Sequence, residues 1–450
     1  MSAGKLLEDW VKTNLDEILL SIVGGGTPSK AKSEYYQGVI PWMSVKDMNK
    51  HTLTDTVDHI TPEAVKNSST NIITAGTPII ATRMSLGKIV TASFDSAINQ
   101  DLKALFLSSG IDRNFFLHWY RSQAQLIESL GTGTTVKGIR LEILKALTIF
   151  LPSLAEQKII AEKLDTLLAQ VDSTKTRLEK IPKILKRFRQ AVLVAAVNGK
   201  LSSESRELQE YSIGSLCVSS FDGPFGSKLK TSDYTKSGVR VVRLENIGHL
   251  EFKKDKETFI SSDKYKELRS NTLLENDLLF SSFVDEDVRV CLVPKSNEIF
   301  INKADCFCLR TNSDLVSPHY LAFILASKAS YEQIKNRVQG ITRPRINLGT
   351  LRSLEFEIPP LSEQHEIVRR VEQLFAYVDT VEKQVNTALS RVNNLTQSIL
   401  AKAFRGELTG QWREENPDLI SGENSAAALL EKIKAERAAS VGKKAPRKKA

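Results

Sequence analysis

Cysteine and histidine are the residue types here that could bind a metal or act as nucleophiles, but their spacing supports neither role. The cysteines are Cys217, Cys291, Cys306 and Cys308, and only the last two lie close together, in an apolar run with the character of a strand. A zinc site needs further ligands, and none is nearby. The histidines are scattered and pair with no nucleophile: His51, His59, His118, His249, His319 and His365. We expect buried structural thiols in a reducing cytoplasm.

Motifs for nucleotide, methyl-transfer and nuclease chemistry are also missing. The segment Gly24–Lys30 is rich in glycine, but its spacing differs from that of a P-loop and it contains Pro28, so we interpret it as a turn. No Asn/Asp-Pro-Pro-aromatic motif for amino-methyl transfer occurs. Glu251–Lys253 could imitate half of a nuclease metal site, yet no suitably placed Pro-Asp precedes it, and a surface strand is favoured. The sequence predicts a chain without catalytic machinery or a bound cofactor.

Length and charge limit the class of protein. A chain of 450 residues is long enough for about two to four domains. The net charge is +9, but the last twenty residues, Glu431–Ala450, carry eight Lys/Arg against two Glu and so contribute +6 of it. Charge alone therefore does not establish nucleic-acid binding, and we expect the basic end to be a frayed, solvated terminus. The most apolar run, Ala191–Val197, is too short to span a bilayer.

An internal repeat organises the chain. The sequence Leu154-Ala-Glu-Gln157 recurs as Leu361-Ser-Glu-Gln364, an offset of 207 residues that continues without a gap for more than forty residues. The same offset superposes Gly199 on Gly406. Chance does not hold one register over such a length, so the chain contains two related halves.

Each copy of the repeat predicts a long helix with a coiled-coil seam, because its apolar residues alternate in steps of four and three. Pro152 and Pro359 mark the helix starts, Gly199 and Gly406 mark the ends, and Pro182 is expected to kink or interrupt the first helix. About forty residues at about 1.5 Å each give a helix about 60 Å long. The predicted seam and subunit-docking residues are Ile160, Leu164, Leu167, Val171, Leu178 and Leu185, with Ile367, Val371, Leu374, Val378, Val381 and Val385.

Two segments of similar length and low mutual identity precede the helices. Each has short β-rich runs, among them 39–45, 77–82, 88–92, 239–244, 277–281 and 288–293, and then one amphipathic helix, Asn114–Leu130 or Pro318–Val338. The predicted fold class is α+β. The predicted organisation is a globular domain (1–152), a helix (153–205), a second globular domain (206–358), a second helix (359–410) and a basic C-terminal tail (411–450).

Helices that stay alike while the globular domains diverge indicate two tasks. We expect the helices to pair with each other as an antiparallel coiled coil, in a molecule with pseudo-two-fold symmetry, and the globular domains to recognise different targets. Such an arrangement suits two half-sites on DNA. Half-sites one helical turn apart need about 34 Å between the recognition surfaces, which is within reach of helices of this length.

Specific segments resemble the specificity subunit of a type I restriction-modification enzyme, over essentially the whole chain. Ala155–Asp172 and Ile184–Val192 strongly resemble the helices of the enteric IA-type group, and Phe404–Thr409 resembles the end of the second repeat. Gly25–Ser29, followed by Ile40–Trp42, resembles the opening of many target recognition domains in this family.

The resemblance implies a non-catalytic, cytoplasmic subunit that binds an asymmetric bipartite site on double-stranded DNA. Each target recognition domain, 1–152 and 206–358, would bind one half of that site, and the helices would set an unread spacer. Two modification subunits would dock on the paired helices and bring S-adenosylmethionine for adenine methylation. Restriction subunits would bring ATP- and Mg-dependent translocation and cleavage.

Candidate DNA contacts are basic residues in loops or beside predicted strands, since such side chains can reach phosphates or guanine edges. The first long helix is also basic between Lys175 and Arg189, and could follow the spacer phosphates, meet a partner subunit or simply face solvent. The individual candidates are Arg83, Lys88, Arg243 and Arg289 beside strands, and Arg343 and Arg345 in a loop.

Two other classes of protein remain as alternatives. A coiled-coil adaptor with two protein-binding domains would explain the helices equally well, but not the family-like openings of the globular domains. A complete single-chain restriction enzyme would need the methyltransferase and nuclease motifs that the sequence lacks.

Overall fold

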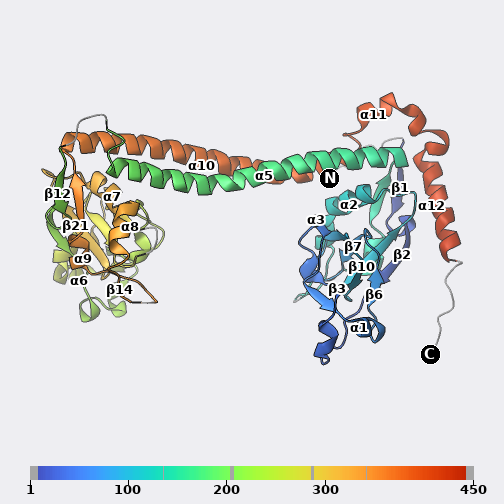
Figure 1. Ribbon diagram of the computed structural model, residues 1–450, viewed down its shortest axis with the longest axis horizontal. Coiled ribbons are helices and arrows are strands. Elements are labelled where there is room, and N and C mark those ends of the chain that lie inside the picture. Colours follow the sequence, from blue (N-terminus) through green and yellow to red (C-terminus); the bar gives the residue numbers. More distant parts are fainter. Residues whose placement is uncertain (1–8, 135, 203–206, 285–287, 341, 442–450) are drawn as a thin grey trace. The chain divides into compact units, whose positions relative to one another are not determined.

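The structure is a computed structural model that describes residues 9–134, 136–202, 207–284, 288–340 and 342–441. Its contacts divide the chain into two compact units. The first unit is Met1–Arg177 together with Leu389–Ala450, and the second is Leu178–Ala388. Each of the two long helices contributes one part to each unit (Figure 1).

The first unit contains three sheets within its described residues. Its strands are β1 (Val11–Asn14), β2 (Leu19–Gly24), β3 (Ile40–Met43), β4 (Thr52–Leu53), β5 (Asp58–Ile60), β6 (Asn71–Ile73), β7 (Ile79–Ala81), β8 (Ile89–Ala92), β9 (Ser96–Ile98), β10 (Leu102–Leu107) and β11 (Thr148–Leu151). They form the pair β1-β11, a five-stranded sheet β2-β10-β7-β8-β4 and a four-stranded sheet β5-β3-β9-β6. Strand β3 is parallel to β9, and β4 is parallel to β8.

The second unit repeats this plan. Its strands are β12 (Gln209–Ser212), β13 (Cys217–Phe221), β14 (Tyr234–Thr235), β15 (Val239–Val242), β16 (Phe259–Ile260), β17 (Thr272–Leu273), β18 (Leu278–Ser281), β19 (Val290–Leu292), β20 (Phe300–Asn302), β21 (Cys306–Thr311) and β22 (Glu355–Ile358). They form the pair β12-β22 and the sheets β13-β21-β18-β19 and β14-β16-β15-β20-β17. The order β2-β10-β7-β8 thus recurs as β13-β21-β18-β19, and parallel β3-β9 recurs as parallel β15-β20. The α+β fold class predicted from the sequence is confirmed.

Apolar side chains between the two larger sheets hold each domain together. In the first unit, Met43 of β3, Ile79 of β7, Val90 of β8 and Ile98 of β9 are buried in one cluster. Such runs of β-branched and other apolar residues form strands because both faces of the strand can be buried. The turns that leave these strands are therefore fixed to a rigid framework.

Two short helices replace each of the two amphipathic helices predicted from the sequence, so that prediction is wrong in both units. The first unit has α2 (Arg113–Ser122) and α3 (Ala124–Ser129), and the second has α7 (Pro318–Ala326) and α8 (Lys328–Ile334). Between α7 and α8 the backbone of Ser327 is extended, with ψ 159°, which ends the helix. Residues Tyr320–Ala326 are all buried, so α7 packs on every side rather than along one stripe. The shorter helices are α1 (Pro62–Lys66), α4 (Leu141–Lys145), α6 (Ser262–Glu267) and α9 (Leu348–Arg352).

The long helices are α5 (Leu154–Val197) and α10 (Leu361–Ala403). Gly199 and Gly406 have left-handed backbones, with φ 66° and 74°, and the bonds from Lys200 N to Ala195 O and from Glu407 N to Lys402 O complete the same glycine cap after each helix. Helix α5 continues through Pro182, so the predicted interruption does not occur. Pro182 has no backbone N–H and so lacks one helical hydrogen bond, but the helix continues on both sides of it.

The two helices pair within each unit. In the first unit, Ile160 and Leu164 near the start of α5 share a buried cluster with Leu400 near the end of α10. In the second unit, Leu193 near the end of α5 shares a cluster with Ile367 near the start of α10. Opposite ends pair, as an antiparallel coiled coil requires. The predicted seam residues are buried (Ile160, Leu164, Val171, Ile367, Val371, Val378 and Val385) or half-buried (Leu167, Leu178, Leu185, Leu374 and Val381).

The expectation that residues 431–450 form a frayed terminus is wrong for residues 431–441, which lie in a helix. After α11 (Gly410–Glu415), helix α12 (Ala426–Val441) packs on the first unit and buries Leu430 and Ile433 in its core. Glu436 accepts hydrogen bonds from the backbone and the hydroxyl of Ser109, both at 3.0 Å. The sequence signal for this helix was its spaced leucine and isoleucine residues, which the positive charge obscured. The basic run Lys443–Lys449 lies outside the described residues.

Candidate nucleic-acid interface

Gln157 ties the start of α5 to the globular part of the first unit. Its side-chain nitrogen donates to the carbonyl oxygens of Gly110 and Pro152, both at 3.2 Å, and its side-chain oxygen accepts from the backbone N–H of Asp112 at 2.8 Å. Asp112 is the N-cap of α2. One buried amide therefore fixes the starts of two helices relative to each other.

Gln364 makes the same contacts in the second unit. Its nitrogen donates to the carbonyl oxygens of Leu315 (3.0 Å) and Pro359 (2.9 Å), and its oxygen accepts from the backbone N–H of Ser317 at 2.7 Å. Ser317 is the N-cap of α7. The glutamine of the repeated Glu-Gln sequence thus attaches each long helix to its domain. The sequence repeat showed that these positions match but not which contacts they make.

Glu156 joins three distant segments at the start of α5. Its carboxylate is fully buried and accepts from Trp10 Nε1 (3.0 Å), from the hydroxyl of Thr409 (2.6 Å) and from Arg413 Nη1 (2.6 Å). Its counterpart Glu363 is also buried, at 3% exposed. The segment after α10 is therefore part of the framework of the first unit.

Arg83 lies where the turn after β7 meets the loop before α4. A backbone bridge pairs it with Gly138, and the backbone N–H of Ile139 donates to Thr82 O at 2.9 Å. The Arg83 side chain is 55% exposed, and its Nη1 lies 3.4 Å from Oδ1 of Asp101, whose side chain is only 8% exposed. The buried carboxylate of Asp101 thus contacts the exposed guanidinium group of Arg83.

Arg345 lies at the equivalent junction of the second unit. Its backbone bridges to Phe283, and the backbone N–H of Ile346 donates to Ser282 O at 2.9 Å. Arg343 lies two residues earlier in the same loop, and both arginine side chains are exposed. The loop of Arg343 and Arg345, which the sequence predicted as a DNA contact, therefore has a structural counterpart in the first unit.

Lys88 and Arg289 occupy equivalent positions, each directly before the second strand of the hairpin, β8 or β19. Lys88 is exposed, and its Nζ donates to Asn49 Oδ1 at 3.2 Å. Arg289 is half-buried, and its Nη1 donates to Leu244 O at 3.4 Å. Both reach toward the segment that follows β3 or β15, so the two candidates lie at the same edge of their units.

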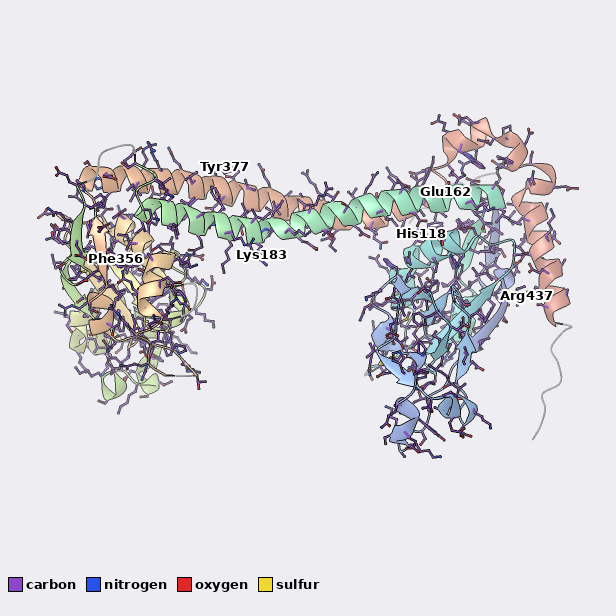
Figure 2. The ribbon with its side chains drawn as sticks, in the orientation of Figure 1. His118, Glu162, Lys183, Phe356, Tyr377 and Arg437 are labelled. Carbon is purple, nitrogen blue, oxygen red and sulfur yellow. The ribbon has the colours of Figure 1, made fainter. Side chains whose placement is uncertain are left out.

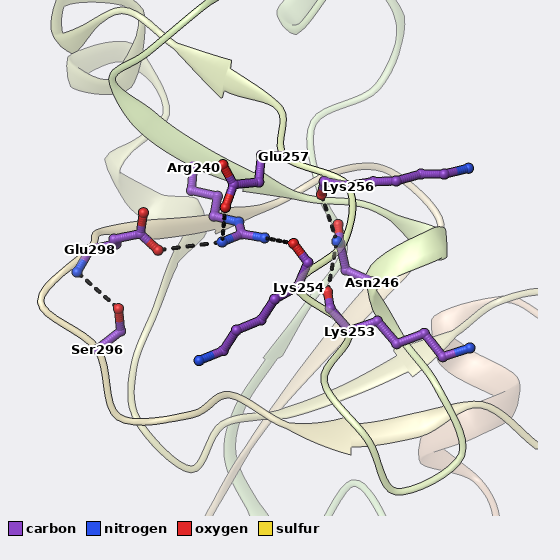
Figure 3. A network of polar contacts seen from close by, with 8 residues as sticks. All are labelled: Arg240, Asn246, Lys253, Lys254, Lys256, Glu257, Ser296 and Glu298. Atoms are coloured by element: carbon purple, nitrogen blue, oxygen red, sulfur yellow. Dashed lines mark hydrogen bonds and ion pairs between the residues drawn. The ribbon is translucent and has the colours of Figure 1, made fainter. Parts of the chain in front are cut away.

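Arg243 lies at that edge as well, where β15 ends. Asn246 accepts from the Arg243 backbone N–H at 2.9 Å. The Asn246 amide also donates to the carbonyl oxygens of Lys253 (3.0 Å) and Lys256 (2.9 Å) (Figure 3). Nη2 of buried Arg240 donates to the carbonyl oxygen of Lys254 at 3.0 Å and so binds the loop that contains Lys253 and Lys256. Two of the sequence candidates contact segments next to β15 and β18: Arg289 donates to Leu244 O, directly after Arg243, and Arg345 forms a backbone bridge with Phe283.

The basic stretch of α5 is divided between packing and exposure. Arg189 pairs with Asp379 and, at 3.2 Å, with Glu382 of α10, so it belongs to the helix pair. Lys183 projects from an exposed position on α5 (Figure 2). The sequence alone could not separate these two roles, because the choice depends on which face of α5 meets α10.

Two histidines, one in each unit, contact residues of α5. His118 Nε2 lies 2.7 Å from Oδ1 of Asp165, and burial lowers the pKa of His118 although Asp165 acts in the opposite direction. In the second unit, His249 Nε2 lies 3.2 Å from Gln190 Nε2, and His249 Nδ1 lies 2.9 Å from Val288 O. Both contacts are satisfied when Nδ1 of His249 donates to Val288 O and Nε2 accepts from the Gln190 amide.

The cysteines pack as structural thiols. Cys291, Cys306 and Cys308 are buried, and all four thiols are free. Burial raises the pKa of Cys217 to about 11 and that of Cys291 to about 12, so these thiols remain protonated at neutral pH. The described residues hold no cluster of three or more His, Cys, Asp or Glu side chains placed to bind a metal ion. Among the same residues, no helix has both the length and the apolar character needed to cross a membrane.

Comparison with known proteins gives matches over both halves of the chain. The family model for the type I restriction modification DNA specificity domain matches residues 7–183 and 207–391. The chain is 42% identical to the EcoKI specificity subunit of Escherichia coli K12 and 40% identical to the StySPI specificity subunit of Salmonella potsdam, each type I restriction enzyme subunit aligned over 100% of both chains.

Solved structures show the same fold. A chain from a structure on complex assembly and conformational transition of the type I R-M system aligns with a TM-score of 0.68 at 19% identity, over 90% of this chain and 100% of that one. The HsdS subunit from Thermoanaerobacter tengcongensis aligns with a TM-score of 0.60 at 18% identity, over 90% of this chain and 99% of that one.

Proposed function

The chain belongs to the family of type I restriction-modification DNA specificity subunits, and we propose that it gives such a complex its DNA sequence specificity. In this role it binds an asymmetric bipartite DNA site, one half through each recognition domain. The observation that carries the proposal is that both units have exposed or half-buried basic residues at equivalent positions, and that the residue types at these positions differ between the units. The equivalent positions of the basic residues are consistent with DNA binding by both units. The differences in residue type are consistent with two different half-sites.

The contacts to DNA are assigned to this edge. In the first recognition domain (1–152) they come from Arg83 and Lys88, which share the turn between β7 and β8. In the second (206–358) they come from four arginines around the equivalent turn: Arg243, Arg289, Arg343 and Arg345. The exposure of Arg83, Lys88, Arg343 and Arg345 supports these contacts, since a phosphate or base edge must reach the side chain.

The long helices set the distance between the half-sites and dock the modification subunits. With 44 residues, α5 is about 66 Å long, enough to separate half-sites by more than one turn of DNA. The coiled-coil seam residues from Ile160 to Leu185 and from Ile367 to Val385 keep the two helices together. Surfaces outside the seam remain for the partner subunits.

Catalysis lies with those partners, and this chain is not an enzyme. Modification subunits supply S-adenosylmethionine and adenine methylation, and restriction subunits supply ATP-dependent translocation and cleavage. We place the assembly in the cytoplasm, where bacterial DNA is accessible.

Methylation mapping tests the proposal. The chain is co-expressed with its modification subunit in a host that lacks other adenine methylation, and methylated adenines are located throughout the genome. We expect one asymmetric motif with two defined parts and an unread spacer of fixed length. A continuous motif, or methylation that depends on the modification subunit alone, would contradict the proposal.

A further inference from the structure

The bridge between the β7–β8 turn and the loop before α4 carries one arginine in each unit, but from opposite sides. In the first unit the bridged pair is Arg83 and Gly138, and in the second it is Phe283 and Arg345. The loop backbones match, since Gly138 N donates to Thr132 O at 2.8 Å and Arg345 N donates to Gln339 O at 3.0 Å. The two units therefore share the same bridged backbone, but the arginine lies on the turn in the first unit and on the loop in the second.

Asp101 is a fixed acid beneath this bridged backbone in the first unit. Its carbonyl oxygen accepts from both the backbone N–H (2.8 Å) and the hydroxyl (2.9 Å) of Thr82, and its own N–H donates to Asn99 Oδ1 at 3.1 Å. Three bonds thus hold the Asp101 backbone, and its carboxylate reaches Arg83 Nη1 at 3.4 Å. The acid limits the positions that the guanidinium group can take, which reduces the entropy lost when Arg83 binds a ligand.

The stem of Arg83 lies beside the loop before α4. A Cβ atom added at Gly138 would lie 3.4 Å from Cγ of Arg83, which is a van der Waals contact distance, so the stem runs along this loop. One nitrogen of the guanidinium group meets Asp101, and the Arg83 side chain as a whole is 55% exposed. A guanidinium group has five donors in a planar fork, so its outer edge stays available for a second planar acceptor.

The neighbouring carboxylate selects between the two acceptors that DNA offers. A phosphate oxygen at Arg83 would meet the negative charge of Asp101, and at a partly buried site that repulsion is not fully screened. The O6 and N7 atoms of guanine accept two hydrogen bonds and carry no net charge. Lys88 differs, because its Nζ donates to the neutral side-chain amide of Asn49, and a phosphate there meets no such repulsion.

We propose that Arg83 reads a guanine in the major groove of the half-site bound by the first unit, and that Asp101 is its positioning residue. This inference rests on the proposed function and names the base that one side chain recognises. In the second unit, Asp305 occupies the place of Asp101 but accepts from the Ser282 hydroxyl at 2.9 Å, and the cation comes from Arg345 across the bridge. The two half-sites accordingly differ at this position.

The test compares Arg83→Ala, Asp101→Asn and Lys88→Ala in the full chain bound to its modification subunit. Methylation rates are measured on the wild-type site and on every single-base-pair variant of both half-sites. For Arg83→Ala we expect preference to fall about five- to 150-fold at one G·C pair of one half-site, the range for losing a bidentate contact. Asp101→Asn should relax the same pair less strongly, and the double variant should match Arg83→Ala.

Lys88→Ala serves as the matched control for a phosphate contact. It should slow methylation evenly on all variants and reduce the slope of log affinity against log salt by about one unit. The inference is overturned if Arg83→Ala also acts evenly, or if Asp101→Asn only lowers stability and leaves every base preference intact. A wild-type complex without any bipartite preference would instead overturn the proposed function.

Discussion

Gln157 donates to the carbonyl oxygen of Gly110 at 3.2 Å, the bond that Gln364 repeats with Leu315 at 3.0 Å. Both glutamines are fully buried, and each holds a long helix to the N-cap of a domain helix. The retained feature of the repeat is therefore the joint between the recognition domain and the long helix. The joint is alike in the two units, while the basic residues at their edges differ.

Replacing Gln157 with Ala should destabilise the first unit by about 2–4 kcal/mol, because two carbonyls and one N–H lose their buried partner. Urea denaturation followed by circular dichroism measures the loss. Gln170→Ala is the control, since Gln170 is exposed on the same helix and should change stability by less than about 0.5 kcal/mol. If Gln157→Ala and Gln170→Ala lowered stability equally, the buried bonds of Gln157 would not stabilise the first unit.

Glu156→Gln tests the buried carboxylate at the start of α5. The amide has nearly the same volume but leaves Arg413, which is 12% exposed, without its counter-charge. Breaking a buried ion pair in this way costs about 3–5 kcal/mol. The fluorescence of Trp10, which donates to Glu156, should also shift, although Trp42, Trp119 and Trp412 contribute to the signal. A change below about 1 kcal/mol would mean that the carboxylate is dispensable.

His118 predicts how the stability of the first unit depends on pH. Burial lowers the pKa of His118 in the folded chain, and the positive charge of Arg121 lowers it further, while Asp165 and Asp112 oppose this. The unfolded chain titrates near about 6.5 and binds the proton more readily, so stability is full above that pH and falls as the pH drops below it.

Phe323 occupies the place of His118 in α7 and packs against Phe375 of α10 at 6.1 Å between ring centroids. His118→Phe should therefore fit and should flatten the loss of stability between about pH 6.5 and pH 5. Part of the slope should remain, because burial also lowers the pKa of His51. Melting temperatures of both proteins across this range provide the measurement. Parallel curves for the two proteins would show that His118 does not titrate in this way.

Helix α12 should stabilise the first unit and not the second. Ile433 is 1% exposed against that unit, and Ile433→Asp places a charge in its core, whereas Ala435→Asp puts the same side chain at an exposed position of the helix. Hydrogen exchange should rise in β1 and β2 for Ile433→Asp alone, because α12 packs on these strands. Unchanged exchange in both variants would mean that α12 contributes no stability.

The repeat predicted the long helices and their glycine caps well, because coiled-coil spacing and left-handed caps are local properties of a sequence. The split of each domain helix, as at Ser327, could not be predicted, since buried packing overrides the periodicity of Pro318–Ala326. Helix α12 could not be predicted from charge, because the basic residues near the end of the chain indicated a solvated terminus although most residues of Ala426–Val441 are alanine, leucine, isoleucine or valine. Partners such as Asp101 for Arg83 lie far apart in the sequence and become visible only once the strands are paired.

Exchanging residues 206–358 for the corresponding segment of a related specificity subunit tests the central claim most directly. The hybrid is co-expressed with the modification subunit, and its methylated adenines are mapped across the genome. If each domain reads one half-site, one part of the motif changes, while the other part, assigned to residues 1–152, stays as it was. A motif that stays whole, or one that changes in both parts, would contradict the account.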